Sequence, residues 1–82
     1  MSMNTPLIEI GSELLFTPDG ASRGIPCEVV KISHRNAWLG GRRYLTVRML
    51  ADDRGLCRRT GDVEIRLEGD HNLTFPNGDP TA

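Results

Sequence analysis

Long hydrophobic runs are missing from this sequence of 82 residues. Its uninterrupted apolar runs are no longer than three residues, as at 14–16, whereas a membrane-spanning helix needs about 20. The first residues also lack the basic region and apolar stretch that form a secretory signal. We therefore expect a cytoplasmic protein that has no membrane partner.

Catalytic and metal-binding signatures are also missing. The sequence contains no Walker loop, no GxGxxG and no HExxH motif. His34 and His71 have no nearby pattern that suggests a catalytic triad. Cys27 and Cys57 form no CxxC pair, so we expect reduced, shielded thiols and no zinc site. A chain this short also leaves little material for a cleft. We expect a non-enzymatic protein with no metal, no cofactor and no small-molecule substrate.

Charge is unevenly distributed along the chain, although the formal net charge is only −1. Residues 23–59 contain nine of the ten basic residues, and eight of the eleven acidic residues lie outside this segment. A basic middle between acidic flanks indicates either an anion-binding face or ion pairs between neighbouring strands.

Alternation of apolar and polar residues is the main periodic signal, and no window shows a helical period. The runs at 27–33, 42–51 and 63–67 predict three strands of an antiparallel sheet. Short strands are also expected at 13–17 and 73–75, and residues 56–59 are expected to form a hairpin with 63–67. A slip in the pattern at Val29-Val30 predicts a bulge. The residues expected to be buried are Val29, Leu45, Val47, Met49, Val63, Ile65 and Leu67.

Several short strands separated by glycine-bearing turns are typical of a small all-β barrel or sandwich. An SH3-like barrel of about five antiparallel strands is the smallest architecture that closes such strands and leaves few exposed edges. We expect a flexible N-terminus at 1–6, a single barrel domain at 7–69 and a mostly irregular tail at 70–82.

The segment 20–32 (GASRGIPCEVVKI) resembles the KOW motif of certain ribosomal proteins and transcription-elongation factors. Gly20 and Gly24 lie where the first two glycines of that motif fall, and Val29 and Ile32 lie at its apolar strand positions. Cys27 replaces a usual glycine, and Arg23 is the only basic residue in the loop. The resemblance covers about a quarter of the chain. It implies an SH3-like barrel whose loop contacts RNA, DNA or other proteins.

A stripe of four alternating residues on the expected 42–51 strand is a candidate nucleic-acid site. Residues two apart on a strand are separated by about 6.8 Å, and an aromatic ring between arginines suits stacking combined with charge. Arg58 and Arg59 would extend this basic surface. The candidate nucleic-acid-binding residues are therefore Arg42, Tyr44, Thr46, Arg48, Arg58 and Arg59.

The alternative is that Glu64 and Glu68 on the neighbouring strand neutralise this stripe. The protein would then be a protein–protein adaptor or a small structural accessory protein of a phage or mobile element. Trp38 and Arg35 would contact the partner, because tryptophan and arginine are enriched in interface hot spots. Trp38 can equally cap the core of the barrel.

Overall fold

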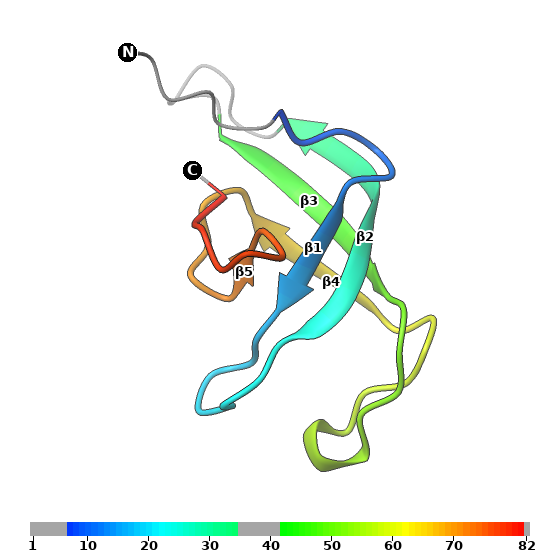
Figure 1. Cartoon of the computed structure of the whole chain (residues 1–82). Coiled ribbons are helices and arrows are strands. Elements are labelled where there is room, and N and C mark those ends of the chain that lie inside the picture. The colour runs from blue at the N-terminus through cyan, green and yellow to red at the C-terminus, as the bar shows by residue number, and fades with distance from the viewer. Residues whose placement is uncertain (1–6, 35–41, 82) are drawn as a thin grey trace.

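Five antiparallel strands form one curled sheet in the computed structural model, which describes residues 7–34 and 42–81. The strands are β1 (Glu13–Phe16), β2 (Ile25–His34), β3 (Arg43–Met49), β4 (Val63–Leu67) and β5 (Leu73–Thr74). Their order across the sheet is β4-β3-β2-β1-β5, and the sheet curls into a half-barrel (Figure 1). The predicted all-β class is confirmed, and the architecture is consistent with a small SH3-like barrel.

The ten-residue strand β2 pairs with both of its neighbours. Its first residues pair with β1, and residues from Cys27 onward pair with β3. The register to β3 shifts between Val29 and Lys31. The extra residue is therefore Val30, at the predicted slip, and such a bulge bends a strand and increases its twist.

The core lies on the concave side of the sheet, between the strands and the C-terminal segment. The predicted inward positions of β3 are confirmed, because Leu45, Val47 and Met49 are fully buried. The buried hydrophobic residues are Ile8, Leu14, Phe16, Ile25, Cys27, Val29, Leu45, Val47, Met49 and Leu73.

The predicted orientation of β4 is wrong. Val63 and Ile65 are 55% and 62% exposed, and Leu67 is only partly buried. The register places Glu64 opposite Val47 and Arg66 opposite Leu45, so the charged side chains of β4 face the inner side.

Phe16 explains why charged side chains are tolerated on the inner side of β4. The guanidinium carbon of Arg66 lies 5.1 Å from the centre of the Phe16 ring, and that of Arg58 lies 5.7 Å from it. Glu64 pairs with both arginines, at 3.2 Å to Arg58 and 3.6 Å to Arg66. The arginine stems cover the ring while the heads pair with carboxylate. An apolar side chain at these positions is therefore not needed to shield Phe16.

Two further segments differ from expectation. Residues 56–59 form no hairpin with β4; Arg54–Leu56 is a 3-10 turn, and Arg58 makes only an isolated bridge to Asp53. The segment 70–81 is mostly irregular, as expected, and it packs against the sheet. Buried Leu73 joins the core, and the Asn72 amide donates to Thr17 C=O at 2.7 Å. Asn72 thereby fastens this segment to the end of β1.

Gly24 has no room for a side chain. A Cβ at this position would lie 2.9 Å from Thr17 Oγ1 and 3.1 Å from Leu15 Cβ. Glycine therefore lets the chain that enters β2 pass close to β1. None of the helices formed by the described residues is long and apolar enough to span a membrane.

The contrast between the faces of β3 and β4 gives a stability test. Met49→Ala is expected to lower the free energy of unfolding by about 2–5 kcal/mol, because it leaves a cavity in a small core. Ile65→Ala is expected to cost less than about 1 kcal/mol, because its side chain already faces solvent. Urea denaturation of both variants measures the difference. Equal losses would contradict the assigned orientation of β4.

Candidate functional site

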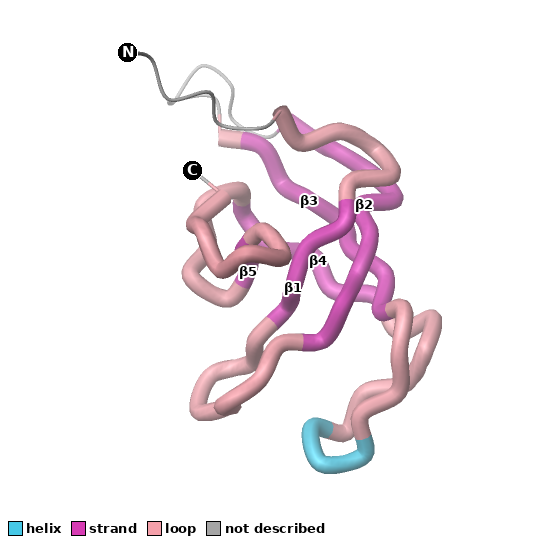
Figure 2. Tube along the Cα trace, in the orientation of Figure 1, coloured by secondary structure: helices cyan, strands magenta, loops and turns pink. Residues whose placement is uncertain are grey.

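The connection between β3 and β4, residues 50–62, projects from one end of the barrel and contains the 3-10 turn (Figure 2). Asp53 caps this turn, since its carboxylate accepts the Leu56 N–H at 3.2 Å. The same carboxylate receives two hydrogen bonds from the Arg23 guanidinium, at 2.6 and 2.7 Å. These bonds hold the pKa of Asp53 below its usual value. The turn is thus fixed to the β1–β2 loop through one ion pair.

Two other aspartates shape the return of this connection to β4. Asp52 accepts the Thr60 N–H at 2.6 Å, and Asp62 accepts the Arg59 N–H at 2.8 Å. The hydrogen bonds from Thr60 lower the pKa of Asp52, and the nearby positive charge of Arg59 lowers it further. The backbone on both sides of Arg59 is therefore held by carboxylates.

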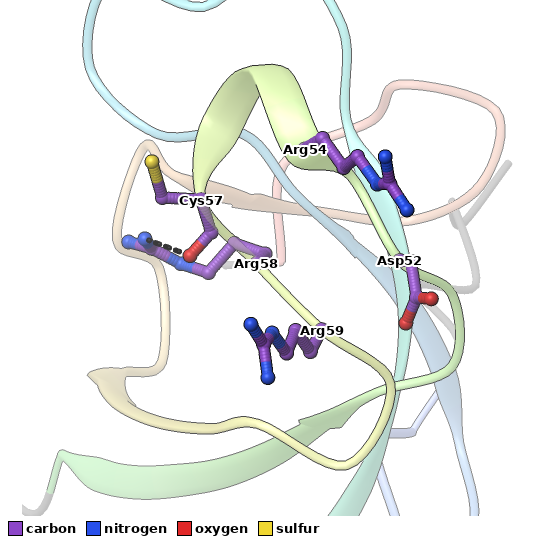
Figure 3. Close-up of a pocket in the computed structure, with 5 residues that line it drawn as sticks. All are labelled: Asp52, Arg54, Cys57, Arg58 and Arg59. Carbon is purple, nitrogen blue, oxygen red and sulfur yellow. Dashed lines mark hydrogen bonds between the residues drawn. The ribbon is translucent and has the colours of Figure 1, made fainter.

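A hollow of about 620 Å³ lies in this connection and is lined mainly by arginine. The lining residues, which we call the arginine pocket, are Asp52, Arg54, Cys57, Arg58 and Arg59 (Figure 3). Three guanidiniums accompany one carboxylate, so the lining carries an excess of positive charge. Arginine presents planar donors that match phosphate and carboxylate oxygens.

The three arginines differ in how firmly they are held. Arg58 pairs with Glu64, lies over the Phe16 ring and donates to Leu56 C=O at 3.1 Å. Arg54 and Arg59 are exposed, and neither forms an ion pair within 4.0 Å with another described residue. Arg58 therefore forms a fixed wall of the pocket, while Arg54 and Arg59 can still engage an anion.

Cys57 is exposed, so the expectation that both thiols are shielded is wrong for this residue. It follows the 3-10 turn with φ of 55°, a left-handed conformation that favours glycine. Cys27 is buried as expected, and its thiol donates to Leu14 C=O at 3.4 Å. Burial raises the pKa of Cys27 to about 12, and the negative charge of Glu13 adds to this effect.

The predicted stripe on β3 does face outward, but one of its two arginines is engaged in an ion pair. Tyr44 and Thr46 are half-buried, whereas Arg42 and Arg48 are exposed. Arg48 pairs with Glu28 on β2. Neutralisation by Glu64 and Glu68 is wrong, because Glu64 lies on the inner side and Glu68 pairs with Arg43 at 2.5 Å.

The six predicted nucleic-acid-binding residues do not form one surface. Arg58 contacts Phe16 and Glu64 on the inner side of the sheet, whereas Arg48 points outward. Trp38 and Arg35 lie outside the described residues.

Sequence reasoning included Arg58 and Arg59 but missed Asp52, Arg54 and Cys57 as their neighbours. The available signal was local: residues 52–59 read DDRGLCRR, with three arginines within six positions. A turn after the two aspartates brings those arginines around one hollow.

The two thiols are expected to react at very different rates with iodoacetamide. Cys57 should be alkylated in the native protein because it is exposed. Cys27 should react only after unfolding, because a pKa of about 12 leaves about one thiol in 10,000 ionised at pH 8. Mass spectrometry over time measures both, with Cys57→Ser as the unreactive control. Alkylation of Cys27 as fast as Cys57 would contradict this arrangement.

Comparisons with protein-family models, with curated proteins and with solved structures found no match to this chain. The functional proposal therefore depends on the geometry and charge of the arginine pocket.

Proposed function

We propose that this protein is a non-enzymatic binding module that holds phosphate groups of single-stranded RNA or DNA in the arginine pocket. The observation that carries the proposal is that Arg54, Arg58 and Arg59 all line one hollow, with Asp52 as the carboxylate in its lining. Phosphate contacts of this kind provide most of the affinity of proteins for nucleic acid.

The charge balance of the whole chain makes this cluster informative. The sequence has a pI of about 6.1, so three neighbouring guanidiniums are not a by-product of a generally basic surface. Arg54 and Arg59 are exposed on this short connection and have no ion-pair partner among the described residues. A bound phosphate would pair with this positive charge, which favours an anion as the ligand.

The geometry supports the pocket more strongly than the outer face of β3. Arg48 on that face is engaged by Glu28, and the neighbouring positions on β4 are the aliphatic residues Val63 and Ile65. This face therefore offers one unpaired arginine of the stripe, Arg42, beside aliphatic residues, whereas the pocket offers both Arg54 and Arg59. We therefore assign the phosphate contacts to Arg54 and Arg59, with Arg58 as the wall behind them.

A protein–protein adaptor is the second candidate, and one observation favours it. Val63 and Ile65 are exposed apolar side chains on the outer face of the sheet, where a partner protein would remove them from water. A small accessory component of a phage or mobile element would use such a face. Binding to nucleic acid separates the two candidates.

Mixed-sequence single-stranded RNA and DNA, each labelled with a fluorophore, provide the test by anisotropy across a salt series. Binding is expected at low salt and should weaken steeply as salt increases, because bound phosphates release counterions. Arg59→Ala should weaken binding and reduce the slope of log affinity against log salt by about one. Arg54→Ala should have a similar effect.

Two controls distinguish the pocket from the outer face of β3. Arg42→Ala also removes one positive charge, but at a residue just before β3 and outside the pocket. It should leave the slope of log affinity against log salt unchanged. Tyr44→Ala should have no effect on binding to the pocket, whereas stacking of a base on Tyr44 would make it cost about 1–3 kcal/mol. Lack of binding to either polymer at low salt would refute the nucleic-acid proposal and favour the adaptor.

A further inference from the structure

Strand β4 lies at the edge of the sheet and pairs only with β3 among the described strands. Glu68 N–H donates to Arg43 C=O at 2.8 Å, which fixes one hydrogen-bonded pair of this ladder. Such pairs alternate along an antiparallel ladder. Glu64 and Arg66 therefore also direct their backbone groups towards β3.

The intervening residues of β4 direct their backbone groups away from β3. Among the described residues, no hydrogen bond joins the backbone groups of Val63 or Ile65 to another segment on this side. The C=O of Leu67 accepts from Asp70 N–H at 2.9 Å, but its N–H points to the same open side. An edge of this kind is a template for another strand.

The side chains of β4 protect this edge only through the inward-facing charges of Glu64 and Arg66, which a second strand with the same two charges in reverse order can pair. Its sequence is VEIRL, with no proline or lysine, and these are residues that commonly block edge pairing. Val63 and Ile65 are exposed on the outer face. Glu64 and Arg66 retain 25% and 33% exposure of their side chains on the inner side, so both remain accessible to a neighbouring strand.

The order of residues in β4 is complementary to itself. If a second copy pairs antiparallel with its centre at Ile65, then Ile65 lies opposite Ile65 of the second copy. Val63 lies opposite Leu67, and Glu64 lies opposite Arg66. Each Glu–Arg pair occurs twice because of the two-fold symmetry, and opposite charges across strands are stabilising.

Other registers are less favourable. Pairing centred on Glu64 or on Arg66 places a charged residue opposite its own copy, where like charges repel. A shift by a single position places Ile65 opposite Glu64 or Arg66 of the second copy. The backbone groups of these residues face β3, and their side chains lie on the other face of the sheet. The register centred on Ile65 aligns all five residues of β4 and combines free backbone groups, apolar pairs and opposite charges.

We propose that two copies of this chain associate through their β4 edges to form a symmetric dimer with one continuous sheet. Two hydrogen bonds join the Ile65 residues, and two more run from Leu67 N–H to Val63 C=O of the other copy. This inference does not depend on the arginine pocket. Pairing of two five-residue strands buries less area than a standard interface, so we expect a dissociation constant of about 10–1,000 µM.

Sedimentation equilibrium of the full chain over a concentration series tests the proposal. The wild-type mass is expected to rise from 9.1 kDa towards twice that value. Ile65→Lys places a lysine opposite its own copy and should raise the dissociation constant at least about tenfold. Ile10→Lys is the matched control, since it changes another isoleucine of similar exposure, 67% against 62%, in the turn before β1, and should associate like wild type.

Mixing complementary variants tests the two-fold axis itself. Ile65→Lys and Ile65→Glu should each be monomeric alone, and an equimolar mixture should associate again. Because Ile65 is exposed, both variants should retain the wild-type NMR dispersion. In wild type, the amides of Ile65 and Leu67 should exchange with solvent more slowly as concentration rises, whereas those of Glu64 and Arg66 should be protected throughout.

Three results would overturn the dimer: a wild-type mass of one chain at about 1 mM, unchanged association of Ile65→Lys, or no association of the mixed variants. Arg59→Ala should dimerise like wild type. Loss of nucleic-acid binding and loss of dimerisation are therefore measured by separate variants.

Discussion

Strand β2 pairs with β1 through its first residues and with β3 along most of its length, so its shape determines the whole sheet. The extra residue at Val30 changes which positions face inward. Cys27 and Val29 point to the core before the bulge, and Ile32, opposite Leu45, packs against it afterwards. If Val30 were paired in regular alternation instead of bulged, Lys31 would face the core and Ile32 would face solvent. One bulge therefore bends the sheet and keeps both halves of its longest strand on the core.

The basic middle of the sequence is partly balanced within the chain. Arg23, Arg43, Arg48 and Arg58 pair with Asp53, Glu68, Glu28 and Glu64, which come from different parts of the sequence. Exposed pairs of this type contribute little to stability. Their main effect is on the surface potential, because they offset part of the positive charge, while Lys31, Arg42, Arg54 and Arg59 have no ion pair with another described residue.

The sequence was most informative where a strand has one apolar face. In β3, Leu45, Val47 and Met49 alternate with polar residues, which determines the buried face from the pattern alone. The slip at Val29-Val30 likewise predicted the bulge. In β4, the same reasoning placed Val63 and Ile65 inward and failed, because the inner side at that point is occupied by Phe16 and two arginine stems. This arrangement depends on contacts between distant segments, which alternation does not encode.

The candidate site was only partly predictable for a similar reason. Arg58 and Arg59 were recognisable as a basic pair. That Arg58 and Arg48 lie on opposite sides of the sheet follows from the register of β3 and β4, which local sequence does not show. The exposure of Cys57 follows from a left-handed backbone angle after a short turn. Free cysteine is commonly a buried residue, so burial was the natural expectation for Cys57, and no local sequence pattern indicates its positive φ.

Arg58 belongs at once to the arginine pocket and to the cover of Phe16. A ligand that binds Arg58 without moving its guanidinium adds contacts to a side chain that already packs on the core, and therefore stabilises the fold. A ligand that draws the guanidinium outward uncovers an aromatic ring and releases Glu64. Occupancy of the pocket and the melting temperature of the barrel are therefore linked thermodynamically. The direction of that linkage shows whether a ligand binds the pocket as it stands or takes Arg58 away from the core.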